Sequence, residues 1–129
     1  MKAVTLCIPF LVALSAAQAH AGSCPSHGTA MARTELVFGA REVNGGAWNE
    51  FLAREVTPRF PDGLTALDGY GQWKAPSGII SREPSRVLLL WHKRSAAADR
   101  KIDAIRDAYK KRFHQLSVMR VDSTDCVAF

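Results

Sequence analysis

Hydrophobic residues recur along residues 34–122 with two different periods, and these periods divide the chain into strands and helices. Four segments have the character of strands, either with the period of two of a half-buried strand or as a short continuous apolar run. The strands predicted in this way are Thr34–Arg41, Leu64–Lys74, Arg86–Lys93 and Ser117–Asp122. Arg86–Lys93 is apolar on both faces, which favours a central position in a sheet. In the last strand we expect Met119 and Val121 to point into the core and Arg120 to point away from it.

Two segments have the period of a helix instead. Trp48, Phe51, Leu52 and Val56 form one apolar face, and Thr57-Pro58 would end that helix because proline cannot continue it. The second helix is predicted to begin at Ser95, a favourable N-cap, and to run to about His114. Its buried stripe would consist of Ala98, Ile102, Ile105, Tyr109 and Phe113.

The order of these elements is β-α-β-β-α-β. Pro76-Ser77-Gly78 is typical of the tip of a hairpin, with Ile79–Arg82 as the returning chain. Right-handed crossovers turn this order into an α+β, ferredoxin-like sandwich with two helices on one face of a four-stranded antiparallel sheet. We expect this single domain to occupy residues 34–129, after a flexible N-terminal segment at 22–33.

The first 21 residues have the features of a secretory signal peptide. Lys2 precedes an apolar run of about 15 residues, and Ala19-His20-Ala21 is a suitable cleavage site. The run is shorter than the roughly 20 residues that a transmembrane helix needs, and it contains Pro9. We therefore expect a periplasmic or secreted protein.

Three cysteines are present, and Cys7 lies in the predicted signal peptide. An even pair, Cys24 and Cys126, remains at opposite ends of the exported chain, which suggests a disulfide in an oxidising compartment. The alternative is lipidation of Cys24, because Ala21-Gly22-Ser23-Cys24 loosely resembles a lipobox. In that case the protein would be an envelope lipoprotein, and only then would it contact a membrane.

Composition excludes several classes of function. The formal net charge of +5 is modest and mixed along the chain, and aromatic residues are not interleaved with a basic stripe, so nucleic-acid binding is not expected. The isolated histidines, without a His-x-His or Glu-x-x-His pattern, argue against a zinc site. Asp62-Gly63 lacks the repeated acidic ligands of a calcium loop. We expect neither a metal nor a cofactor.

The sheet face that the helices leave uncovered is the predicted working surface. We expect a shallow binding site there that contains Glu35, Arg41, Tyr70, His92 and Arg120, with close approach of a ligand or second chain allowed by Gly39, Gly69 and Gly71. The alternative is that these are ordinary half-exposed residues of a sheet. Apolar neighbours such as Val37 and Leu88 make a homodimer through this face a further possibility.

Several sequence runs resemble a known family. The run Thr57–Thr65 (TPRFPDGLT) is the most specific, and it either ends the first helix or forms a recognition loop. The other matching pieces are Glu35–Gly39, the helix with Trp48 and Phe51, Gly71–Trp73, and Val121–Ser123 with Cys126. Over about Thr34–Phe129 the chain resembles the bacterial domain-of-unknown-function family 3574. The resemblance implies small exported bacterial proteins and transfers no activity or catalytic residue.

These observations predict an exported module that binds a small molecule or a protein. The alternative is a small enzyme without a cofactor on a dimeric ferredoxin-like fold. In that enzyme His92 and Tyr70 would be the acid/base pair, which requires their side chains to lie close together.

Overall fold

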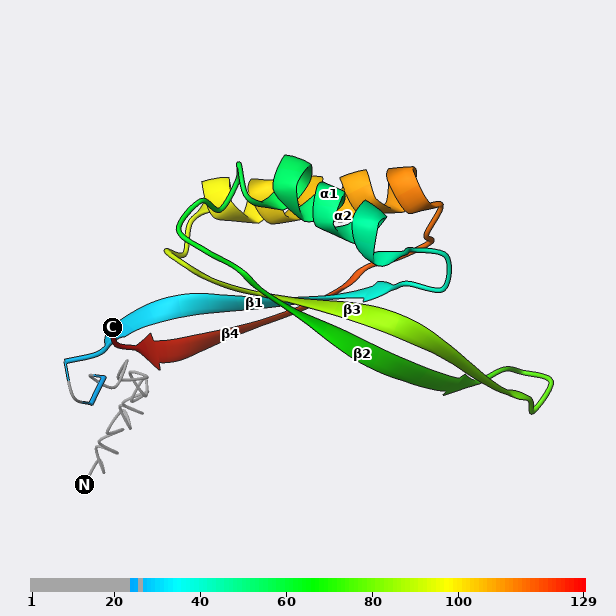
Figure 1. Ribbon diagram of the computed structural model, residues 1–129. Coiled ribbons are helices and arrows are strands. Elements are labelled where there is room, and N and C mark those ends of the chain that lie inside the picture. The colour runs from blue at the N-terminus through cyan, green and yellow to red at the C-terminus, as the bar shows by residue number, and fades with distance from the viewer. Residues whose placement is uncertain (1–23, 26) are drawn as a thin grey trace, which may run out of the picture.

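The computed structural model describes residues 24, 25 and 27–129 (Figure 1). The predicted signal peptide, residues 1–21, lies outside them. In the described part of the chain the elements are β1 (Thr29–Gly39), α1 (Gly45–Phe51) with a π-helical turn η1 (Leu52–Val56), β2 (Thr65–Lys74), β3 (Ile80–His92), α2 (Ala96–Phe113) and β4 (Met119–Val127).

The four strands form one antiparallel sheet in the order β2-β3-β1-β4. Both helices cover the same face of this sheet (Figure 1). This arrangement confirms the predicted ferredoxin-like α+β fold. No helix in the described residues is long and apolar enough to cross a membrane.

The helices begin where capping side chains satisfy free N–H groups. The Ser95 hydroxyl accepts a hydrogen bond from the Ala98 N–H at 3.1 Å, as predicted for an N-cap, and α2 ends at His114 in a left-handed conformation. The Asn44 side chain caps α1 in the same way, accepting from the Ala47 N–H at 2.9 Å.

Aromatic side chains form the centre of the core between helices and sheet. Tyr109 from α2 packs on Phe38 from β1, with ring centroids 4.5 Å apart, and on Phe51 from α1 at 5.2 Å. The Tyr109 hydroxyl donates to the Gly39 carbonyl at 2.7 Å. Burial raises the pKa of Tyr109 to about 12. Of the predicted stripe of α2, Ala98, Ile102, Ile105 and Tyr109 are buried, and Phe113 is partly buried against the core.

β1 and β4 are both longer than the sequence predicted. β1 begins at Thr29 rather than Thr34, and β4 extends to Val127 rather than Asp122, because the two added ends pair with each other. A Cys24–Cys126 disulfide, with Cα atoms 5.4 Å apart, joins the chain before β1 to β4. The predicted disulfide is therefore confirmed, and part of the segment expected to be flexible belongs to the sheet.

Odd-numbered residues in all four strands point to the face that the helices leave uncovered, called the open face below. The pairings fix this parity, because Val87 pairs with Val37 and Leu67, and Val37 pairs with Met119. The prediction that Met119 and Val121 point into the core is wrong, since they are 55% and 48% exposed.

β2 and β3 continue past the end of β1 as a two-stranded hairpin, residues 70–84, called the arm below. β1 ends at Gly39, opposite Ser85, whereas β2 and β3 remain paired as far as Lys74 and Ile80. The arm projects beyond the helix layer (Figure 1).

Candidate functional site

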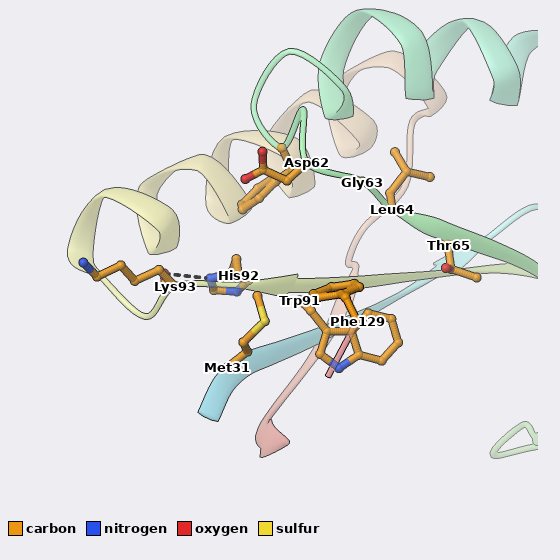
Figure 2. Close-up of a pocket in the computed structure, with 10 residues that line it drawn as sticks. Met31, Asp62, Gly63, Leu64, Thr65, Trp91, His92, Lys93 and Phe129 are labelled. Atoms are coloured by element: carbon orange, nitrogen blue, oxygen red, sulfur yellow. Dashed lines mark hydrogen bonds between the residues drawn. The ribbon is translucent and has the colours of Figure 1, made fainter. Parts of the chain in front are cut away.

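A pocket of about 620 Å³ lies where β2 separates from β3, at the end of the sheet opposite the arm (Figure 2). Its volume is typical of sites for small organic molecules. The residues that line it come from the start of β1, the turn before β2, the end of β3 and the C-terminus: Met31, Phe60, Asp62, Gly63, Leu64, Thr65, Trp91, His92, Lys93 and Phe129.

The turn at 60–63 creates this pocket by lifting the chain away from β3. The Phe60 N–H donates to the Val56 carbonyl at 3.0 Å, which holds Phe60 against the end of η1 in the helix layer. Gly63 has φ +137°, a conformation that favours glycine. The chain rejoins the sheet only at Thr65, opposite Leu89, although β3 runs on to His92.

The main chain of Trp91 faces the gap left by β2. Residues of an antiparallel strand point their N–H and C=O groups alternately to the two neighbouring strands. The Ala40 N–H donates to the Pro84 carbonyl, so even-numbered residues of β3 bond to β1 and odd-numbered ones point toward β2. Trp91 lies beyond Leu89, and no group in the described residues bonds to its main chain. One donor and one acceptor are thus available in the pocket.

His92 is held at the pocket by a hydrogen-bonded chain from β4. The fully buried Thr34 hydroxyl donates to Asp122 Oδ1 at 2.7 Å, and its oxygen lies 3.1 Å from His92 Nε2, while His92 Nδ1 lies 3.1 Å from the Lys93 carbonyl. The Phe60 ring packs on the imidazole with centroids 5.5 Å apart. Burial raises the pKa of Asp122, but hydrogen bonds from Thr34 and Arg120 outweigh this effect and bring it below its ordinary value.

The pocket combines aromatic walls with charges of both signs at its rim. Phe60, Trp91 and Phe129 supply the walls, while Lys93 and Asp62 carry opposite charges. The Trp91 Nε1–H donates to Asp125 at 3.0 Å, which fixes the indole on the open face. A second hollow of about 420 Å³ shares Trp91 and Phe129 with this pocket.

The structure does not bring the five predicted binding residues together. Glu35 is on the open face and pairs with Arg33 at 2.8 Å, as expected for its parity. Arg41 lies in the turn after β1, near Ser81 and Glu83 at the base of the arm. Of the five, only His92 lines the pocket.

Arg120 lies on the helix side of the sheet, which corrects the expectation that it faces the open side. Its guanidinium pairs with Asp99 of α2 at 2.5 Å and with Asp122 at 2.8 Å. Burial lowers the pKa of Arg120, but these hydrogen bonds reverse the effect and raise it. The side chain therefore ties β4 to α2.

Tyr70 and His92 are too far apart to act as an acid/base pair on one small substrate. Tyr70 pairs with Pro84, eight residues before His92 on β3, so the two lie about 26 Å apart at about 3.3 Å per residue. Tyr70 is also 70% exposed at the base of the arm.

The space above two of the predicted glycines is occupied by this chain's own side chains. Gln115 lies over Gly39, with its Oε1 2.9 Å from where a Cβ would be, and Ser85 lies over Gly69. These glycines admit neighbouring side chains of the same chain. Within the described residues no group of three His, Cys, Asp or Glu side chains is placed to hold a metal ion.

Sequence reasoning missed most of the pocket. The run Thr57–Thr65 is predicted either to end the first helix or to form a recognition loop, and it does end the helical segment, because η1 stops at Val56. The same run also supplies Phe60, Gly63 and Thr65 to the pocket. The signal in the sequence that could have indicated a pocket wall is the position of Phe60 between the turn-forming residues Pro58 and Pro61-Asp62-Gly63.

Comparison with known proteins adds the fold and the family. No curated protein matches the chain. A phage SAM lyase in complex with S-methyl-5'-thioadenosine is a similar solved structure, with a TM-score of 0.57 at 12% identity, over 75% of this chain and 90% of that one. CutA from Synechococcus elongatus PCC7942 is another similar structure, with a TM-score of 0.51 at 14% identity, over 77% of this chain and 80% of that one. The same protein complexed with a Bis-Tris molecule has a TM-score of 0.52 at 11% identity, over 77% of this chain and 84% of that one.

At these identities the likeness concerns the fold alone. A family model, by contrast, matches residues 33–129, three quarters of the sequence. The chain belongs to the family described as "Protein of unknown function (DUF3574)".

Proposed function

We propose that this protein is an exported binding module that takes a small organic ligand in the pocket where β2 leaves β3. The observation that carries the proposal is the unpaired main chain of Trp91 between aromatic walls. A concave, mostly apolar site with a few convergent polar groups is the usual form of a small-molecule site.

The polar groups of the pocket favour a flat ligand with one hydrogen-bonding edge. The Trp91 N–H and C=O would receive an acceptor and a donor that lie side by side, as in an amide. The Phe60 and Trp91 rings would cover the apolar part of the ligand, and the Lys93 ammonium favours an anionic group at its end. The S-methyl-5'-thioadenosine and Bis-Tris complexes of the similar structures support the fold's capacity for small ligands, without indicating which one this chain binds.

A matched pair of variants tests this site. Thr65→Trp fills the pocket from β2, whereas Ala66→Trp places the same side chain on the opposite face of the strand, outside the lining. With the aromatic anion anilinonaphthalene sulfonate as the probe, Thr65→Trp should weaken binding about tenfold, a loss of about 1.4 kcal/mol. Ala66→Trp should leave it unchanged. Equal affinity of Thr65→Trp and the wild-type protein would exclude the pocket as the site.

Export to an oxidising compartment is part of the same proposal. The Cys24–Cys126 disulfide supports it, because such bonds persist in the periplasm and outside the cell. Lipidation of Cys24 would use the same sulfur, so the disulfide and a lipid anchor exclude each other. Intact-mass spectrometry of protein from the cell envelope separates them. A mass for residues 22–129 less two hydrogens supports the disulfide, and a lipid-sized excess supports anchoring.

We also propose that two copies associate through the open face. Leu67, Val87, Val37 and Met119 stand side by side on the four strands, and we call them the central row. An apolar row across a whole sheet face is typical of an interface. Sedimentation velocity should show a concentration-dependent dimer that Met119→Lys weakens, and a monomer at all concentrations would exclude it.

A further inference from the structure

We infer that the arm of a second copy closes the pocket of the first, so that the binding site is composite. The inference rests on the homodimer proposed above. It starts from the arm, which is a two-stranded ribbon without a third strand or a helix against it (Figure 1). Such a ribbon is at best marginally stable in water, and additional packing stabilises it.

The exposed apolar surface of the described residues is concentrated on the arm and the open face. Trp73 and Ile79, on the open-face side of the arm, are 52% and 69% exposed. Seven of the nine exposed large hydrophobic residues lie in these two regions: Leu67, Tyr70, Trp73, Ile79, Ile80, Met119 and Val121. Leu67, Trp73, Ile79, Met119 and Val121 have the parity of the open face, so one partner on that face would cover these five, whereas Tyr70 and Ile80 point to the helix side.

A second copy fits this surface when the two-fold axis runs along the central row. The row is perpendicular to the strands, so rotation about it places each strand over the same strand of the partner and reverses its direction. Two face-to-face sheets prefer nearly aligned strands, as this arrangement provides. The contact is isologous, so every residue pair occurs twice.

Side-chain sizes and charges agree with this axis. Gly69 and Ser85, two residues from the row on the arm side, would face Thr65 and Leu89 of the partner subunit, so small residues oppose larger ones. Two residues further, Glu83 would come beside Arg33 of the partner subunit. The Arg33 side chain is part-exposed and already pairs with Glu35 at 2.8 Å, so Glu83 of the partner subunit would add a carboxylate to an existing ion pair on the open face.

The same axis brings the arm to the pocket. Ser81 and Lys93 both lie six residues from Val87, in opposite directions, so each is about 20 Å from the axis at about 3.3 Å per residue. Ser81 therefore stands over Lys93 of the partner subunit. Trp73 of β2 pairs with Ser81 of β3. It therefore reaches the position beside Lys93 of the partner subunit that is left empty because β2 of that subunit has already left the sheet. That position is the pocket.

The contact area is close to what a stable dimer needs. Strands about 4.8 Å apart and about 3.3 Å per residue give the paired face and arm a projected area of roughly 600 Å² per copy. Side-chain relief makes the accessible area larger, and a standard interface buries about 800 Å² per partner. The arm lengthens the contact toward both pockets and places the Trp73 indole beside Lys93 of the partner subunit, diagonally across the pocket from Trp91 of the partner subunit. A planar ligand would then lie between two aromatic surfaces.

A cross-link between positions 81 and 93 tests the inference. On one chain these positions are twelve residues apart along a strand, about 40 Å, so a bismaleimide of short span cannot join them within one copy. The Ser81→Cys/Lys93→Cys protein, with its native disulfide intact, should give a covalent dimer at concentrations where sedimentation shows association. Ser81→Cys alone and Lys93→Cys alone should give none.

Two results would overturn the inference while the homodimer proposal survives. One is a dimer in sedimentation without the 81–93 cross-link. The other is a cross-link by Ser81→Cys alone, which would place the two arms against each other. A monomer at all concentrations would remove both the dimer and the closing arm. The pocket proposal would still stand if Thr65→Trp, unlike Ala66→Trp, weakened binding of anilinonaphthalene sulfonate to that monomer.

Discussion

Removal of the disulfide should destabilise the protein mainly through its unfolded state. The bond links Cys24 and Cys126, which are 102 residues apart. In the folded protein the chain ends near the bond are also held by strand pairing, because Ala30 pairs with Cys126 and Thr29 with Val127. Replacement of both cysteines by serine should therefore leave the sheet in place.

The magnitude follows from the length of the closed loop. A cross-link across about 100 residues lowers the entropy of the unfolded chain enough to stabilise the folded state by about 4.7 kcal/mol in the chain-entropy model. Residual structure in the unfolded chain reduces this value, so we expect a loss of about 2–4 kcal/mol. Small domains have a total stability of about 5–15 kcal/mol, so the loss is a large share.

Guanidinium unfolding, followed by tryptophan fluorescence from the buried Trp48, measures this loss. The Cys24→Ser/Cys126→Ser protein should unfold at a lower midpoint and with a larger m value, since its unfolded chain is more expanded. Wild-type protein treated with reductant should behave like the variant, which controls for the serine substitutions. A loss below about 1 kcal/mol with an unchanged m value would refute the reasoning and indicate an unfolded chain that is already compact.

Three further perturbations test other parts of the structure. Tyr109→Phe leaves the Gly39 carbonyl without its donor and should cost about 1–2 kcal/mol in the free energy of unfolding at pH 7. Because folding raises the pKa of Tyr109 from 10 to about 12, wild-type protein should lose stability as pH rises through this range, and Tyr109→Phe, measured by denaturation up to pH 11.5, should not show that loss. Thr34→Val should raise the pKa of Asp122 in a carboxyl NMR titration. The lowered pKa of Asp122 stabilises the folded state above about pH 4, and this stabilisation is lost as the pH falls and the carboxylate is protonated. The difference in the free energy of unfolding between Thr34→Val and wild type should therefore shrink in acid. A difference that stays constant would contradict this role of Thr34. Trp73→Ala should weaken binding of anilinonaphthalene sulfonate about tenfold in the dimer and leave the monomer unaffected, whereas an equal loss in both would exclude a closing arm.

The local pattern of the sequence was sufficient for the helices and the order of the strands. The Ser95 cap and the apolar stripe of α2 depend on neighbours three or four residues away, which the sequence displays directly. Which side chains of β4 face the helices depends instead on contacts with elements distant in the sequence. Arg120 turns inward because α2 presents Asp99 to it, and this contact is 21 residues away in sequence.

The candidate site was less predictable because it is formed by the registers in which β1 and β2 pair with β3. The predicted set placed Glu35, Tyr70 and His92 on one face, yet Tyr70 pairs with Pro84, eight residues before His92 on β3, and both side chains point to the helix side of the sheet. A shift of one residue reverses the face of every side chain in a strand, and hydrophobic alternation alone does not fix that shift. Trp91 is a site residue only because β2 does not reach it, so its main chain has no partner on that side of β3.

A single offset in the sheet explains both unusual surfaces of the molecule. β1 pairs with β3 from His92 to Ser85, whereas β2 pairs with it from Leu89 to Ile80. The displacement of β2 by three residues at one end leaves the Trp91 main chain unpaired and opens the pocket. The displacement by five residues at the other end leaves the arm without β1. Because one register produces both, a copy turned about the central row brings an arm to each pocket, and a shift of β2 would alter both surfaces at once.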